Sequence, residues 1–167
     1  MLLGEGVIRR GSMLRLGLGI LLAAIAVPAA AAPSTVYVMR HLQKAEGSDP
    51  GLTEEGKANA QKLAAMLAGK RPRAIYVSST RRAQETAAPL AARLHLTPKL
   101  YDPRDTPALV AKVKAEKGTV LVVGHSNTVP EMVEKLGAPR PADLGEGDFG
   151  DVFKVSHGKV KKLRVGK

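Results

Sequence analysis

Two short, almost wholly apolar runs constrain the fold of this chain most strongly. They are residues 35–39 (TVYVM) and 119–123 (TVLVV), and neither alternates with polar residues in the way a half-exposed strand does. Strands of this kind are typical of a parallel sheet that is buried on both faces. Each run stops at a polar pair, Arg40-His41 after the first and Gly124-His125 after the second. The sequence therefore predicts central strands that end at chemically active residues.

Helix-like segments separate these strands. From apolar spacing and turn residues we expect helices at 53–69, 83–94, 106–118 and 128–137, and further strands at 74–78, 151–156 and 159–165. Alternation of strands and helices predicts an α/β fold, a three-layer α/β/α sandwich with a mainly parallel central sheet. The basic segment KVKKLRVGK at the C-terminus is expected to form an edge strand, where lysines discourage pairing with other chains.

Capping residues mark two of the expected helix starts. Thr53 is a candidate N-cap, followed by Glu54 and Glu55 at the positive end of the helix dipole. Residues 128–131 (TVPE) have the pattern of a capping box with proline in the first turn. Pro89 lies inside the second expected helix, where it should kink the helix axis.

The first 32 residues differ in composition from the rest of the chain. Basic, apolar and small residues follow one another there: Arg9, Arg10 and Arg15, then residues 16–27, then PAAAAP at 28–33. A membrane helix needs about 20 apolar residues, whereas this order with a shorter run is typical of a secretory signal. We therefore expect a signal peptide at 1–32, cleaved between residues 30 and 32, and one periplasmic or secreted domain at 33–167 without a membrane span. A retained anchor and a cytosolic amphipathic segment are the alternatives.

Charge and cysteine content narrow the function classes. The chain carries a net charge of +11, and without the three arginines and one glutamate of residues 1–32 the domain keeps +9. Such a field favours anionic partners. With three tyrosines, two phenylalanines and no tryptophan, the chain has few rings for stacking bases, so we do not expect nucleic acid as the partner. The absence of cysteine excludes a thiolate nucleophile and a cysteine-rich metal site.

Three polar segments follow three of the predicted strands. They carry Arg40 and His41, then Arg82 shortly after Ser78, then His125. Ligands of open α/β sheets bind at the carboxyl ends of the strands, so we expect these segments to meet in one crevice. Two arginines and two histidines placed together repel one another unless an anion lies among them. The alternative is that the four are unrelated surface residues.

Three segments of the chain resemble the signature segments of the histidine phosphatase superfamily, the phosphoglycerate mutase-like proteins. They read VMRHLQK, SSTRRAQETA and VVGHSNTVP. The resemblance extends from Val36 to about Leu136 and is strongest for small single-domain members. It implies that His41 is a nucleophile that becomes phosphohistidine, with Arg40 beside it as a phosphate ligand.

The same resemblance assigns two more residues to the pocket. The pattern Ser-x-x-x-Arg-Ala implies that Arg82, and not Arg81, is the pocket arginine, and His125 is the second pocket histidine. An imidazole attacks phosphorus through an unprotonated nitrogen, so we expect the other ring nitrogen of His41 to donate to a fixed acceptor such as a carbonyl. Arginine forks and a protonated His125 would stabilise the phosphoryl oxygens.

Other substrate contacts are less specific in the sequence. Ser126 and Asn127 are candidate substrate-binding residues, although capping or turn roles suit them equally. Backbone N–H groups near the start of the fourth helix, from Ser126 to Val129, are further candidate anion contacts. No metal or cofactor is required by this set of residues.

The leaving group needs a proton, and the donor is the least certain part of the site. Asp102 is the first candidate and Asp105 the second, with water or another group as the remaining possibility; either aspartate suits a turn or an N-cap as well. The family usually has a small residue and a glutamate after Arg-His, whereas this chain has Leu42 and Gln43. This departure keeps a non-catalytic descendant under consideration.

The sequence thus predicts a metal-independent phosphatase that hydrolyses phosphomonoesters, or phosphohistidine or pyrophosphate bonds, through a phosphohistidine on His41. Short segments at 42–52 and 95–105 predict an open pocket for small phosphorylated molecules or phosphorylated macromolecular surfaces. A mutase is not expected, because it must shelter its phosphoenzyme from water. The alternatives are an exported phosphate-binding module of the same fold and a cationic envelope protein without a site.

Overall fold

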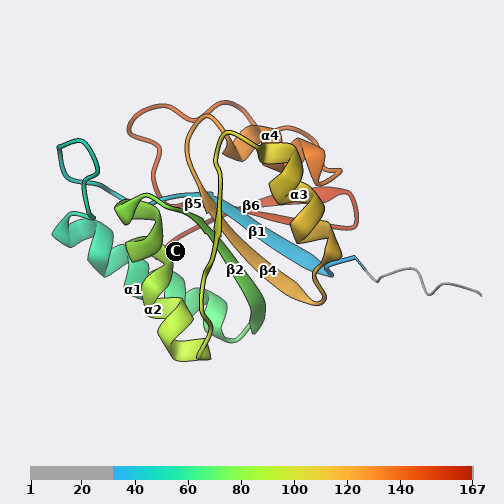
Figure 1. The fold of residues 1–167 in the computed structure, drawn as a ribbon, viewed down its shortest axis with the longest axis horizontal. Coiled ribbons are helices and arrows are strands. Elements are labelled where there is room, and N and C mark those ends of the chain that lie inside the picture. The colour runs from blue at the N-terminus through green and yellow to red at the C-terminus, as the bar shows by residue number, and fades with distance from the viewer. Residues whose placement is uncertain (1–31, 167) are drawn as a thin grey trace, which may run out of the picture.

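The computed structural model describes residues 32–166, which form a single layered α/β unit (Figure 1). The strands are β1 (Thr35–Arg40), β2 (Pro72–Ser78), β3 (Lys99–Tyr101), β4 (Thr119–Gly124), β5 (Asp151–Ser156) and β6 (Lys159–Arg164). The helices are α1 (Glu54–Ala68), α2 (Arg81–Leu94), α3 (Thr106–Ala115) and α4 (Val129–Lys135). The expected signal peptide at 1–32 lies outside the described residues except for its last residue.

The six strands form one sheet in the order β3-β2-β4-β1-β5-β6. The pairs β3-β2, β2-β4 and β4-β1 are parallel, while β5 and β6 add an antiparallel edge. The two apolar runs of the sequence are the adjacent central strands β1 and β4, as expected for strands covered on both faces. The predicted mainly parallel sheet is confirmed, and β6 is the edge strand.

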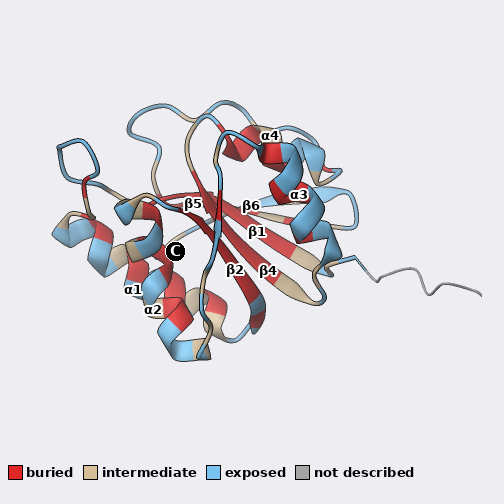
Figure 2. Ribbon diagram, viewed as in Figure 1, coloured by how far each residue is buried: buried red, intermediate tan, exposed pale blue. Residues whose placement is uncertain are grey.

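Two apolar layers hold the helices against the sheet (Figure 2). On one face, α1 and α2 pack against a cluster that includes Met39, Leu63, Leu90 and Leu121. On the other, α3 and α4 pack against a cluster that includes Val38, Val122 and Met132. Alternate residues of β1 and β4 contribute to opposite clusters because successive side chains of a strand point to opposite faces. The result is the predicted three-layer sandwich.

Several local predictions are confirmed. Thr53 caps α1, with its side chain accepting from the Gly56 N–H, and Gly69 ends the helix. Pro89 lies inside α2, and the kink expected at this residue stays a prediction. His157 and Gly158, both with positive φ, make the turn of the β5-β6 hairpin.

Two local predictions differ from the structure. The three-residue strand β3 lies in a segment that we expected to be loop, because Lys99 and Leu100 are exposed at the sheet edge and give no apolar run. The capping box at the start of α4 does not form: the Thr128 hydroxyl accepts from the His125 N–H (3.1 Å) and makes no cap hydrogen bond. No helix within residues 32–166 is long and apolar enough to cross a membrane.

Candidate active site

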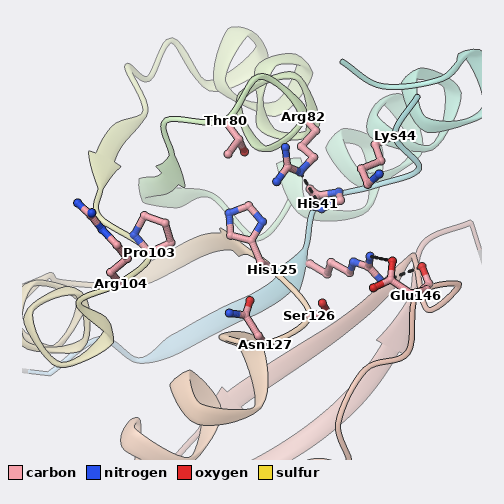
Figure 3. A pocket seen from close by; sticks show the side chains of 11 residues that line it. His41, Lys44, Thr80, Arg82, Pro103, Arg104, His125, Ser126, Asn127 and Glu146 are labelled. Atoms are coloured by element: carbon pink, nitrogen blue, oxygen red, sulfur yellow. Dashed lines mark hydrogen bonds and ion pairs between the residues drawn. The ribbon is translucent and has the colours of Figure 1, made fainter. Parts of the chain in front are cut away.

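A surface pocket of about 400 Å³ lies where β1, β2 and β4 end (Figure 3). Its lining comes from five separate parts of the chain: Arg40, His41, Lys44, Thr80, Arg82, Pro103, Arg104, His125, Ser126, Asn127 and Glu146. Both predicted histidines and both predicted arginines are among these residues, together with Ser126 and Asn127. The ring centroids of His41 and His125 are 5.5 Å apart, so one phosphate-sized anion can contact both rings.

The hydrogen bonds of His41 determine which ring nitrogen is free. Nδ1 lies 2.9 Å from the Leu42 carbonyl oxygen, and Arg82 Nε donates to Nε2 at 3.1 Å. A guanidinium only donates and a carbonyl only accepts, so Nδ1 carries the proton and Nε2 presents its lone pair. The expected carbonyl partner of His41 is thus the carbonyl of Leu42, and Nε2 is the nitrogen available for attack.

The sheet register places His41 at the strand ends. Arg40 pairs with Gly124, and the His41 N–H donates to the Gly124 carbonyl at 2.9 Å. Gly124 allows a close approach here, because a Cβ at this position would lie 2.5 Å from the Met132 methyl and 3.0 Å from the Thr128 hydroxyl. The two histidine-bearing segments are therefore joined directly by the β1-β4 ladder.

Helix α2 fixes the position of Arg82 relative to His41 through Thr86. The fully buried Thr86 hydroxyl accepts from the Leu42 N–H at 3.0 Å and donates to the Arg82 carbonyl at 2.8 Å. The side chain of Leu42 is also fully buried, in the cluster under α1 and α2. Leucine at this position therefore anchors the loop after β1 in the core.

Asp49 joins the same loop to the start of α2. Its carboxylate accepts from the Arg81 N–H (3.1 Å) and lies 3.5 Å from Arg82 NH1. The N-cap residue of α2, Thr80, makes no cap hydrogen bond of its own, so Asp49 supplies the missing acceptor from across the pocket. Glu85 holds the loop from the other side by accepting from the Leu52 N–H at 2.6 Å.

Arg40 is buried, with 4% of its surface exposed, beneath the loop at 145–148. Its NH1 donates to the carbonyls of Gly145 (2.6 Å) and Glu146 (3.0 Å), and its guanidinium lies 4.2 Å from the centre of the Phe149 ring. Arg40 Nε is buried without a hydrogen-bond partner. Because an unpaired buried N–H of a cation is costly, this atom points to a missing acceptor at the pocket.

His125 is oriented by two hydroxyl groups. Its Nε2 lies 2.9 Å from the Ser78 hydroxyl, which is itself 3.0 Å from the Thr80 hydroxyl, and its backbone N–H donates to Thr128. The N–H groups of Thr128 and Val129 donate to the His125 carbonyl. Those two groups are therefore not free for an anion, which corrects our expectation for the start of α4.

Burial favours the neutral form of both histidines near pH 7. Burial, together with the nearby charge of Arg82, lowers the pKa of His41 to about 4. Burial, followed by the charges of Arg82 and Arg40, lowers the pKa of His125 to about 4 as well. A bound anion opposes these effects, so the protonated His125 that we expected requires the anion to be present.

The two candidate aspartates do not line the pocket. Asp102 accepts from Arg104, whose hydrogen bonds lower the pKa of the Asp102 carboxyl to about 2, and only its neighbours Pro103 and Arg104 reach the lining. Asp105 accepts from the Ala108 N–H as the N-cap of α3. They occupy the turn and cap positions that we had considered as alternatives, and an aspartate with a pKa of about 2 is a poor proton donor at neutral pH.

Sequence reasoning missed Glu146, Lys44 and Arg104. Glu146 lies in the Pro/Gly-rich segment after α4, whose residues show no helical or strand periodicity. It lines the pocket because Arg40 donates a hydrogen bond to its carbonyl. Gln43 does not line the pocket. Its side chain instead makes hydrogen bonds to Glu55 and Asn59 of α1. Within residues 32–166 no three histidine, aspartate or glutamate side chains are grouped as metal ligands.

Part of the chain is similar to one known protein family. Residues 36–104 match the model of the histidine phosphatase superfamily (branch 1), which spans β1 through the segment that carries Arg104. No curated protein matches the chain significantly.

Solved structures share the fold at low sequence identity. The protein histidine phosphatase SixA, in complex with tungstate, is 23% identical with a TM-score of 0.59, covering 77% of this chain and 94% of SixA. The putative phosphohistidine phosphatase SixA from Agrobacterium tumefaciens is 21% identical with a TM-score of 0.60, covering 78% and 96%. The mycobacterial glucosyl-3-phosphoglycerate phosphatase Rv2419c is 16% identical with a TM-score of 0.62, covering 78% and 97%.

Proposed function

We propose that this chain is a phosphatase of the histidine phosphatase superfamily, whose model it matches at residues 36–104, and that it transfers a phosphoryl group to His41 Nε2 and then to water. Its substrates are phosphomonoesters, or compounds with phosphohistidine or pyrophosphate bonds. The fold neighbours named above are phosphohistidine and glucosyl-3-phosphoglycerate phosphatases, which supports the reaction class.

One observation carries the proposal: a nucleophilic lone pair and an unpartnered cationic donor line the same pocket. His41 Nε2 presents its lone pair beside Arg82, and Arg40 Nε is buried with no acceptor. A phosphoryl group brings both an electrophilic phosphorus for the first and oxygen acceptors for the second. A carboxylate or a sugar offers oxygen acceptors but no electrophilic phosphorus.

The reaction then follows from the charges around the phosphorus. As His41 Nε2 bonds to phosphorus, Arg82 Nε loses its acceptor on the imidazole, and its N–H turns to a phosphoryl oxygen. Arg40, Arg82 and a His125 protonated in response to the anion balance the charge on the equatorial oxygens. Water then attacks the phosphohistidine, breaks the P–N bond and releases phosphate. In this scheme the arginines stabilise the negative charge of the phosphoryl oxygens, and no metal is assigned a role.

The pocket rim supports small or protruding substrates. Lys44 and Arg104, both exposed, line the pocket on different sides of the histidine pair (Figure 3). The segments at 42–52 and 95–105 stay short, so a phosphorylated side chain on a macromolecule and a free small molecule are both candidate substrates.

A direct assay tests the proposal. Purified chain is assayed with p-nitrophenyl phosphate, and His41→Ala is assayed in parallel with inorganic phosphate binding measured by calorimetry. Turnover that depends on His41 supports the phosphatase. Phosphate binding by the wild type without turnover of p-nitrophenyl phosphate, phosphohistidine or pyrophosphate would instead support the exported phosphate-binding module.

We also propose that the domain is exported to the periplasm or secreted. The basic, apolar and small residues that succeed one another at 9–33 support this. N-terminal sequencing of the protein recovered from the periplasmic or medium fraction tests it: a start between residues 31 and 33 is expected, and an intact N-terminus in the cytosolic fraction would contradict it.

A further inference from the structure

A leaving alkoxide needs a proton, and one carboxyl group among the described residues lines the phosphoryl pocket. It belongs to Glu146. The other two carboxylates beside the pocket cations already pair with other groups. Asp102 is bound by Arg104, and Asp49 accepts from Arg81 and lies against Arg82.

The backbone of Glu146 is fixed by Arg40. The Glu146 carbonyl accepts from Arg40 NH1 at 3.0 Å, next to the stronger bond to Gly145 at 2.6 Å. Asp148 closes the turn: its side chain accepts from the Gly145 N–H (2.7 Å), and its own N–H donates to the Gly145 carbonyl (3.1 Å). The same buried guanidinium that would bind phosphate therefore sets the place of Glu146.

The side chain of Glu146, by contrast, is free to move. It is 96% exposed, and its Oε2 lies 3.8 Å from Arg40 NH2, beyond hydrogen-bond distance (Figure 3). Only the Arg40 side of this ion pair is buried, and the exposed carboxylate makes no hydrogen bond to it at this distance, so the pair can be exchanged readily. A phosphoryl group that takes up the donors of Arg40 would displace the Glu146 carboxyl from this ion pair and lie beside it in the pocket.

We propose that Glu146 donates the proton to the leaving oxygen and takes one from water in the second step; this rests on the proposed phosphatase function. In the first step the bond from His41 Nε2 to phosphorus forms, the bond from phosphorus to the ester oxygen breaks, and that oxygen receives the Glu146 proton. In the second step water bonds to phosphorus, the P–N bond breaks, and the proton of the attacking water passes to the Glu146 carboxylate. The side chain returns to its starting form.

The test compares substrates by the basicity of their leaving groups. p-Nitrophenolate leaves without protonation, whereas an alkoxide from an alkyl phosphate does not. In Glu146→Gln we expect kcat/KM for ethyl phosphate to fall by about 10²–10⁴-fold, as for loss of a general acid, with a much smaller change for p-nitrophenyl phosphate. Glu146→Asp should restore part of the loss. Asp143→Asn, a carboxylate of the same segment that pairs with Arg140, is the matched control and should leave both substrates unchanged.

The outcomes distinguish the assignment of Glu146 as proton donor from the proposed phosphatase function. No turnover of any phosphoryl substrate by the wild type would overturn both. An active Glu146→Gln variant with unchanged discrimination between the two substrates, or with an equal loss on both, would overturn the assignment alone. So would a selective loss on ethyl phosphate in Asp102→Asn in place of Glu146→Gln. Thermal unfolding of each variant checks that it is folded.

Discussion

Arg82 Nε donates to His41 Nε2 across 3.1 Å, so the lone pair of that nitrogen is held by a guanidinium in the same pocket. The same bond positions the imidazole, and the positive charge of Arg82 opposes its protonation. In the proposed reaction, substrate binding exchanges this bond for one from Arg82 to a phosphoryl oxygen. Arg82 would then be a positioning residue in the free protein and an electrostatic one during transfer.

Replacing Arg82 should reduce catalysis far more than replacing its neighbour. We expect Arg82→Gln to lower kcat by about 10²–10³-fold, the usual cost of one preorganised donor to a developing oxyanion. Arg81 is exposed and pairs with Glu85, so Arg81→Gln should change kcat little. Steady-state kinetics with p-nitrophenyl phosphate measures both. Equal effects of the two substitutions would contradict the assignment of the pocket arginine.

The protonation state of His41 should be visible directly. With a pKa lowered to about 4, its ring is neutral from pH 7 down to about 5 and becomes charged only below that range. Nitrogen NMR of the ring should show protonated Nδ1 and unprotonated Nε2 at pH 6. Arg82→Gln should raise the pKa of His41, because a nearby positive charge is removed. A midpoint near the ordinary 6.5 in the wild type would contradict the burial described for this ring.

Thr86 should contribute measurably to stability. Thr86→Val keeps the shape of the side chain but removes the acceptor of the buried Leu42 N–H. An unsatisfied buried donor costs about 1–3 kcal/mol, and urea unfolding should show a loss of free energy of unfolding in that range. Thr80→Val at the half-buried edge of the pocket provides a comparison in which a smaller loss is expected. A Thr86→Val variant as stable as the wild type would show that the hydroxyl is not needed there.

Asp49 combines a cap with an ion pair, and two substitutions separate them. Asp49→Ala removes the acceptor of the Arg81 N–H, so the free energy of unfolding should fall by about 1 kcal/mol. Asp49→Asn keeps an acceptor and should retain most of that stability while losing the charge next to Arg82. An equal increase in KM for phosphate esters, or an equal decrease in kcat, in both variants would show that the charge of Asp49 positions Arg82. Wild-type kinetics in Asp49→Asn would show that only the cap of α2 matters.

The sequence predicted the parts of the site that lie next to strong strand signals. His41 and His125 follow the two buried central strands, and parallel pairing of those strands brings them together without further information. Arg82 was predicted because it follows the strand at 74–78, and the family resemblance selected it over Arg81; the structure places it in the first turn of α2. The three layers of the fold were also predicted from local patterns, because each helix has one apolar face.

The residues that sequence reasoning missed depend on long loops. Glu146 reaches the pocket through hydrogen bonds from Arg40, more than a hundred residues earlier, and no local pattern reveals that contact. Asp49 caps a helix from another loop for the same reason. At Thr128 the local pattern of a capping box was misleading, since the hydroxyl holds the His125 backbone instead. Tertiary hydrogen bonds decided each of these cases.

The most direct test of the account is to trap the phosphorylated protein. Wild-type chain is mixed with a ³²P-labelled substrate, quenched within milliseconds in alkali, and digested for mass spectrometry. The account predicts base-stable, acid-labile phosphate on His41 at Nε2 in the wild type and none in His41→Ala. Steady turnover with no label, or with label on another residue, would contradict it.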